Sequence, residues 1–211
     1  TRTPIDKNEG SIWDYLRKLA DETGLITEED DESILSKQYE LVDVKRDNVP
    51  LAQYLGDKTK LATYSMPKHV YYPFGCNASQ KAAVEAALTH QVSVIQGPPG
   101  TGKTQTILNI IANLLMKGKT VLVVSNNNSA VENVAEKLNG EGLGFLVAKL
   151  GSVQNKETFI ANQPEHPAMT GWKIDEQTTT KNLAKDSLQA VSQGFDAQLK
   201  QAKLKAEYDA D

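Results

Sequence analysis

One short stretch of the sequence combines glycines, a lysine and a hydroxyl at fixed spacing. Residues 97–104 read Gly-Pro-Pro-Gly-Thr-Gly-Lys-Thr and fit the pattern G-x-x-x-x-G-K-[ST] in full. Glycines let backbone N–H groups converge on phosphate oxygens where a Cβ would obstruct. Lys103 can reach the β- and γ-phosphates, and the Thr104 hydroxyl can ligate Mg²⁺. We therefore predict that a nucleoside triphosphate is held by Gly97, Pro98, Pro99, Gly100, Thr101, Gly102, Lys103, Thr104 and Gln105.

The elements around this loop fit a phosphate site. A continuous apolar run precedes it and an amphipathic helix pattern follows, so the alternative of a plain Gly/Pro turn is disfavoured. Helix and strand patterns alternate from residue 78 to residue 150, which favours a parallel sheet with crossover helices. The predicted fold is therefore α/β, a P-loop NTPase (RecA-like) sheet with flanking helices. Helices are expected at 78–90, 103–117 and 129–139, and strands at 92–96, 120–125 and 145–150.

A glutamine upstream of the loop has two readings. Asn77 and Gln80 can form a capping box at the start of a helix. Alternatively, the Gln80 amide can pair with the N6 and N7 edge of adenine. The residues themselves leave both open.

A polar cluster follows the strand expected at 120–125. Three consecutive asparagines exceed what capping a helix requires, although a cap remains the alternative. Ligands bind at the carboxyl edge of parallel α/β sheets. The residues of this edge are Ser125, Asn126, Asn127, Asn128 and Ser129.

These motifs together resemble superfamily 1 helicases, in particular the branch that contains the nonsense-mediated-decay RNA helicase and its DNA-acting relatives. The resemblance is carried by N-x-S-Q at 77–80, by the loop, and by N-S-A-V-E-N-V at 128–134. It implies ATP and Mg²⁺ as cofactors, Gln80 as the adenine reader, and a single strand of DNA or RNA at residues 125–129. The usual proline of this last motif is absent here. Ring ATPases share the loop, but they also carry an apolar strand that ends in Asp-Glu, and no such sequence follows Lys103.

Three regions are expected along the chain. An N-terminal α+β accessory region covers residues 1–75, with strands within 39–47 and 60–74. A partial ATP-binding domain covers 76–160, and the start of an inserted helical stalk covers 161–211. Apolar residues at three-four spacing on a long polar helix predict a coiled-coil partner, and the absence of a returning helix predicts a truncated fragment. The seam consists of Leu188, Val191, Phe195, Leu199, Ala202 and Ala206.

Composition narrows the setting. The net charge of −4 offers no basic face, so a nucleic-acid contact would be local. A single cysteine, Cys76, fits a reducing cytoplasmic setting, and no apolar run is long enough to span a membrane. Because no arginine follows the loop, we expect the chain to bind nucleotide but to turn it over poorly.

Two other functions remain open from sequence. One is a nucleotide-gated scaffold whose helical arm recruits a protein partner, which differs from a motor in lacking strand binding at 126–128. The other is a small-molecule kinase, which leaves Gln80 and the asparagines unexplained.

Overall fold

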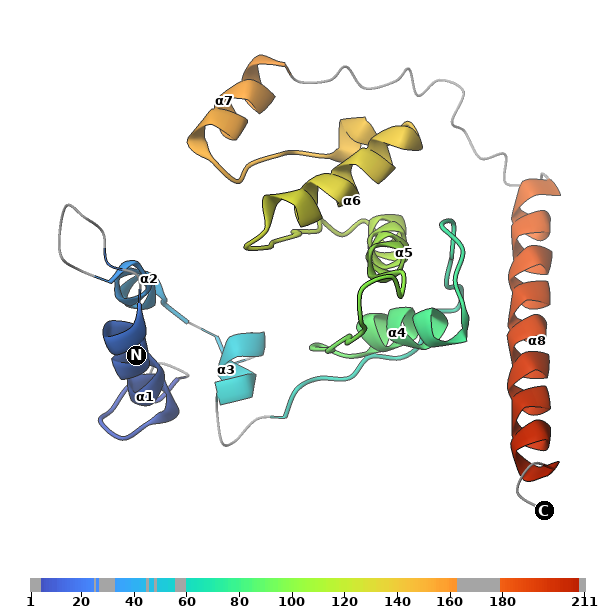
Figure 1. Cartoon of the computed structure of the whole chain (residues 1–211), viewed down its shortest axis with the longest axis horizontal. Coiled ribbons are helices and arrows are strands. Elements are labelled where there is room, and N and C mark those ends of the chain that lie inside the picture. Colours follow the sequence, from blue (N-terminus) through green and yellow to red (C-terminus); the bar gives the residue numbers. More distant parts are fainter. Residues whose placement is uncertain are drawn as a thin grey trace. The chain divides into compact units, whose positions relative to one another are not determined.

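The structure is a computed structural model that describes residues 5–24, 26, 33–44, 46–47, 49–55, 60–162 and 179–208. The acidic run at 28–32, His166, the pair Asp175-Glu176 and the loop at 163–172 lie outside the described residues. The chain forms two compact units, one comprising Thr1–Ser65 with Thr89–Val94 and the other Met66–Leu88 with Ile95–Asp211. Figure 1 shows the helices in chain order.

The first unit is built on short helices, α1 (Ile12–Thr23), α2 (Ile34–Leu41) and α3 (Pro50–Leu55). Its core consists of Ile5, Trp13, Val44 and Ala52. The ring of Trp13 lies 5.0 Å from that of Tyr39 on α2, and α1 and α2 pack together. A small aromatic and aliphatic core therefore joins these helices.

Side-chain caps begin α1. Ser11 accepts a hydrogen bond from the Asp14 N–H at 3.1 Å, as an N-cap serine does. Asp14 in turn accepts from the Gly10 N–H at 3.0 Å and pairs with Lys18 at 3.0 Å. These partners, the Gly10 N–H first, hold the pKa of Asp14 below its ordinary value.

The strand predictions in this part of the chain were wrong in one place and unconfirmed in another. Residues 39–41 belong to α2 rather than to a strand. Ser33 caps that helix by accepting from the Ser36 N–H, so a local cap and helical spacing outweigh the β-branched residues that follow. Residues 60–74 are irregular apart from one antiparallel bridge between Thr63 and His90.

The second unit carries the loop between helices. The predicted helices are confirmed to within one residue at each end as α4 (Ala78–Thr89), α5 (Lys103–Met116) and α6 (Asn128–Gly140). A helix that the sequence analysis missed, α7 (Val153–Ala161), is capped by Ser152. The long polar helix is α8 (Thr179–Tyr208), and its predicted seam residues Leu199 and Ala206 have side chains outside the described set.

Glycines end α5 and α6 in the same way. Gly118 has φ +65° and Gly142 has φ +73°. In each case the glycine N–H and the next N–H bond back to the helix, as in a Schellman motif; after α5 these bonds reach Leu115 and Leu114, at 2.8 and 3.0 Å. After α6, Leu143 folds back onto the helix core.

The core of the second unit lies where α5 and α6 pack together. Its buried residues are Leu108, Ile111, Val134 and Leu138. Phe74 and residues of the segments between helices pack against them. Their spacing follows the three-four period of one apolar face on each helix.

The predicted parallel sheet is not confirmed. Among the described residues no strand forms, and two isolated bridges are present. Residues 144–146 form a 3₁₀ turn, so the strand predicted at 145–150 was wrong at its start. Val94 and Leu122 are both 83% exposed, whereas a parallel strand is buried on both faces. Strand pairing depends on partners remote in sequence, and these segments have none among the described residues.

Candidate functional site

The loop between residues 97 and 102 has the backbone expected of a phosphate cradle. Gly100 and Gly102 adopt φ +84° and φ +77°, a region that residues with a Cβ rarely enter. A Cβ at Gly100 would meet open space, so this glycine is required by conformation and leaves its surroundings accessible. Thr101 steadies the turn by donating its hydroxyl to the Pro98 carbonyl at 2.9 Å.

The start of α5 presents unpaired backbone donors at the end of the loop. Gly102 is its N-cap and supplies no side-chain hydrogen bond. The first N–H groups of a helix have no partners within the helix and carry its positive dipole end. Lys103 and Thr104 are the first two residues of α5, so both lie at this anion-attracting end.

Lys103 is already held by the loop. Its ammonium donates to the carbonyls of Gly97 at 2.6 Å and Pro98 at 2.9 Å. An ammonium has three donors, so one N–H is left for a phosphate oxygen without rearrangement. The exposed lysine therefore fits the phosphate-binding role.

Gln80 lies directly beside the loop. The capping box is confirmed, because the Asn77 N–H donates to Gln80 Oε1 and the Gln80 N–H donates to Asn77 Oδ1, each at 2.9 Å. The Gln80 amide nitrogen donates to the carbonyls of Thr101 at 3.1 Å and Gly102 at 3.4 Å. The side chain is buried on the same face of α4 as Val84 and Leu88.

These bonds use both ends of the Gln80 amide. In this arrangement Gln80 fastens α4 to the loop, and it also approaches Gln105 Oε1 at 3.2 Å. Pairing with both N6 and N7 of adenine would require Gln80 to exchange its loop contacts for the base.

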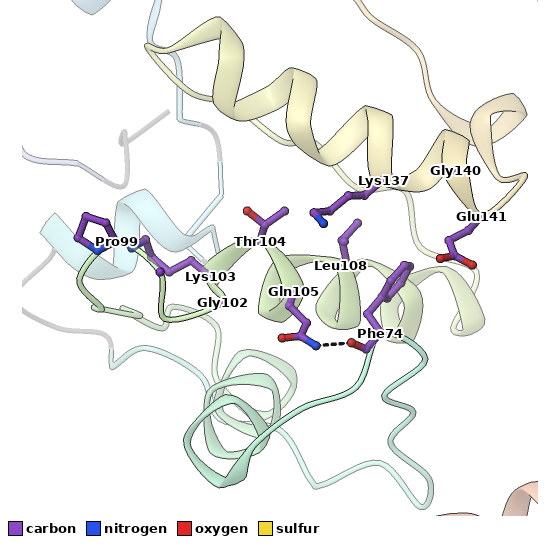
Figure 2. A pocket seen from close by; sticks show the side chains of 11 residues that line it. Phe74, Pro99, Gly102, Lys103, Thr104, Gln105, Leu108, Lys137, Gly140 and Glu141 are labelled. Carbon is purple, nitrogen blue, oxygen red and sulfur yellow. Dashed lines mark hydrogen bonds between the residues drawn. The ribbon is translucent and has the colours of Figure 1, made fainter.

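A cleft of about 930 Å³ opens beside the loop and runs along α5 to the end of α6 (Figure 2). Lys103 and Thr104 lie at its loop end, and Phe74 lies further along α5 beside Leu108. Lys137 on α6 extends toward Thr104 in Figure 2. No ion pair joins Lys137 to an acidic group among the described residues. The full lining consists of Phe74, Pro99, Gly100, Gly102, Lys103, Thr104, Gln105, Leu108, Lys137, Gly140 and Glu141.

A row of side-chain amides on α5 binds the backbone of residues 71–75. Asn113 accepts from the Tyr71 N–H at 2.9 Å and donates to the Tyr71 carbonyl at 2.6 Å. Asn109 accepts from the Phe74 N–H at 3.2 Å and donates to the Gly75 carbonyl at 2.7 Å. Gln105 donates to the Phe74 carbonyl. We call Gln105, Asn109 and Asn113 the amide row.

Asn109 and Asn113 were not predicted as site residues, and Gln105 was predicted only as part of the phosphate loop, whereas its side chain donates to the Phe74 carbonyl. The members of the amide row recur at four-residue spacing, which places them on one face of α5. Asn109 is 0% exposed and Asn113 3%, and amides buried in a helix must find partners. The four-residue spacing of amides within an apolar helix was the signal that could have found them. Phe74, Lys137 and Glu141 were likewise not assigned to the site.

The asparagine edge divides between capping and exposure. Asn127 is the N-cap of α6 and accepts from the Ser129 N–H at 3.0 Å. The Asn127 N–H donates to Ser125 Oγ, also at 3.0 Å. Asn126 and Asn128 are exposed, and no side-chain hydrogen bond is recorded for either within the described part of the chain. The structure therefore gives Asn127 a local role and leaves these two amides at the surface.

The groups around Cys76 do not activate it. Burial, more than any other influence, raises the pKa of the Cys76 thiol, and Lys81 opposes this while Glu85 adds to it. Burial followed by the Glu85 charge also raises the pKa of Tyr72, whose hydroxyl donates to Glu85 at 3.4 Å. A thiol with a raised pKa is a weak nucleophile.

Two further searches concern the described residues. None of their His, Cys, Asp and Glu side chains form a group of three or more that could hold a metal ion. No helix in this part of the chain is both long and apolar enough to cross a membrane.

Comparison with known proteins decides the family. A family model described as an AAA domain matches residues 75–210, which is more than half of the 211 residues. The chain belongs to this AAA domain family. The match covers the loop, α4, α5 and α6, and membership implies the P-loop NTPase fold and the use of a nucleotide with Mg²⁺ in general.

Relatives of this AAA domain include a protein named as a DNA helicase and two named as regulators of nonsense transcripts. The DNA polymerase alpha-associated DNA helicase A of Schizosaccharomyces pombe is 40% identical over 77 residues, covering 36% of this chain and 12% of that protein. Regulator of nonsense transcripts 1 of Caenorhabditis elegans is 37% identical over 112 residues, 51% of this chain and 10% of that protein. Its Neurospora crassa homolog is 34% identical over 134 residues, which cover 61% of this chain and 12% of that protein.

These relatives confirm the resemblance to superfamily 1 helicases of the nonsense-mediated-decay branch. The chain spans about a tenth of the length of the curated relatives that it matches. No solved structure matches the chain significantly.

Proposed function

We propose that this chain is the ATP-binding portion of a superfamily 1 helicase or ATPase that acts on single-stranded nucleic acid. The observation that carries the proposal is the accessible loop at the uncapped start of α5, with Gly100 and Gly102 at positive φ. The names of two relatives, a DNA helicase and an ATP-dependent helicase, support helicase activity on nucleic acid. We also propose three regions along the chain: an accessory region at 1–75, a partial ATP-binding domain at 76–160 and the start of a helical stalk at 161–211.

The triphosphate would be bound mainly by backbone and charge. The N–H groups at the start of α5 would donate to its oxygens, and the Lys103 ammonium would supply the positive charge. Thr104 fits Mg²⁺ because it carries a hydroxyl and lines the cleft next to Lys103. Mg²⁺ held there would neutralise negative charge on the phosphates. Slow turnover of the nucleotide by this chain remains a prediction.

The single-stranded nucleic acid would bind at the edge formed by Ser125 to Ser129. Asn126 and Asn128 are exposed and can donate to phosphate or sugar oxygens. Asn127, which caps α6, would orient this edge rather than contact the strand. Because the net charge is −4, binding would depend on these local contacts and not on a basic face.

The loop assignment is tested by titrating the full chain with ATP and Mg²⁺. Lys103→Ala removes one charge-assisted bond, so we expect the affinity to fall about tenfold or more. Lys119→Ala, an exposed lysine outside the cleft, is the matched control and should bind as the wild type does. Equal affinities of Lys103→Ala and the wild type would reject the loop as the site.

A second candidate is a nucleotide-gated scaffold, which the exposed apolar residues of α8 favour. Val191 of the predicted seam is 43% exposed, and a polar helix of 30 residues with an exposed apolar seam is typical of one strand of a coiled coil. Strand binding that is lost in Asn126→Ala and Asn128→Ala supports the motor. Absence of strand binding, with association that requires Val191, supports the scaffold.

A further inference from the structure

Phe74 lies in the irregular segment 71–75 and lines the cleft at a distance from its loop end. It also packs against the core around Leu108. From Lys103 to Leu108, α5 rises roughly 7.5 Å, comparable to the length of an extended triphosphate chain. In Figure 2 the ring lies beside Leu108, away from Lys103 along the helix. A ligand with its phosphates at Lys103 that extends along this cleft would bring its nucleoside near Phe74.

The backbone of Phe74 is fixed from both sides. Its N–H donates to Asn109 and its carbonyl accepts from Gln105. The following carbonyl, of Gly75, accepts from Asn109 at 2.7 Å. An irregular segment must still satisfy its buried polar groups, and here the amide row does what a neighbouring strand would do.

The same row reaches the loop. Gln105 Oε1 accepts from Gln80 Nε2 at 3.2 Å, and Gln80 Nε2 lies 3.1 Å from the Thr101 carbonyl. One set of amides thus joins the phosphate end of the cleft to its aromatic end. Asn109 is fully buried and does not line the cleft, so it can act on a ligand only through the backbone of Phe74 and Gly75 that it binds.

We propose that Phe74 binds the nucleoside part of the nucleotide through its ring face, and that Asn109 and Gln105 are positioning residues that hold Phe74 there. The proposal rests on the nucleotide site proposed above. Stacking on a phenyl ring is tolerant of the base, because every base has a π-face. Phe74 therefore contributes affinity for nucleosides as a class and does not distinguish adenine from guanine.

The test compares two ligands on the full chain, ATP and inorganic tripolyphosphate, each with Mg²⁺. Phe74→Ala should weaken ATP about tenfold, the scale of one stacked base, and leave tripolyphosphate within about twofold, the margin left by distant independent sites. Phe74→Tyr should restore the preference for ATP. Asn109→Leu should reduce that preference as Phe74→Ala does. Because both ligands are measured on the same variant, a smaller folded fraction lowers both equally and cancels in the ratio.

The control is Ile107→Ala, at a position of α5 that is 36% exposed and lies outside both the cleft and the amide row; its ratio should match the wild type. Equal losses of ATP and tripolyphosphate in Phe74→Ala or Asn109→Leu would overturn the proposal, because both residues would then only maintain the loop. An unchanged ATP affinity in Phe74→Ala, with a loss in Lys103→Ala, would overturn it while the nucleotide site stands. If the wild type bound neither ligand, the nucleotide site and the proposal would fail together.

Discussion

Single residues decide whether the loop can hold phosphate, and glycine conformation is the clearest case. Gly100 and Gly118 share a positive φ, +84° and +65°, and at both a Cβ would meet open space. Only Gly100 lines the cleft. The two positions therefore separate the backbone cost of a side chain from an effect on the ligand.

We expect Gly100→Ala and Gly118→Ala each to lower the free energy of unfolding by about 1 kcal/mol, the cost of a Cβ in the left-handed region. Gly100→Ala should also weaken ATP binding, because the loop would leave the conformation that exposes its N–H groups. Urea unfolding and ATP titration of both variants check this. A loss of ATP affinity in Gly118→Ala as large as in Gly100→Ala would contradict it.

Asp14 predicts a pH dependence of stability. Its folded-state pKa lies below the ordinary value of 3.8, chiefly through the Gly10 N–H and then Lys18. A carboxyl with a depressed folded pKa contributes stability above pH 3.8, and this contribution is lost as the pH falls through the folded pKa. We would measure the free energy of unfolding between about pH 5 and about pH 2. It should fall less with acid in Asp14→Asn than in the wild type. Parallel curves would refute the assignment.

At the scale of elements, α5 joins the loop, the cleft and residues 71–75. The amide row explains how a segment without strand pairing is held. Asn109→Leu would leave the Phe74 N–H and the Gly75 carbonyl without their partner. Unsatisfied buried polar groups cost about 1–3 kcal/mol each.

We therefore expect Asn109→Leu to lower the free energy of unfolding by about 2 kcal/mol or more. Asn155→Leu, on the exposed surface of α7, is the control and should stay within about 0.5 kcal/mol of the wild type. Chemical denaturation of both variants gives the comparison. Equal small effects would show that the row does not hold the segment.

Helices α4, α5 and α6 could be predicted from sequence because their signals are local. Ser11, Asn77 and Gly118 mark helix ends through bonds to residues within five positions, and the apolar period of α5 lies within one stretch. The phosphate loop is equally local. The amide row could not be predicted in this way, because Asn113 meets Tyr71 across 42 positions.

At the scale of the whole chain, the apolar segments expected as strands are the main difference between expectation and structure. Sheet pairing is non-local, so an apolar run alone does not specify a partner. Leu122 is 83% exposed, although its run was predicted to be buried. In the chain as described, this side chain contributes little to folding.

We expect Leu122→Asp to change the free energy of unfolding by less than about 0.5 kcal/mol. Ile111→Ala, in the core between α5 and α6, should cost about 2–5 kcal/mol. Denaturation of the full chain distinguishes the two. A large cost at Leu122 would mean that the predicted sheet forms in solution.

The central claim is that the backbone at residues 100–104 holds a triphosphate. Hydrogen exchange of the individual backbone amides, measured on the full chain with and without ATP and Mg²⁺, tests it most directly. The account predicts slower exchange at Gly100, Gly102, Lys103 and Thr104 when ATP is bound. Saturating ATP that leaves these amides unchanged, while protecting others elsewhere in the chain, would contradict it.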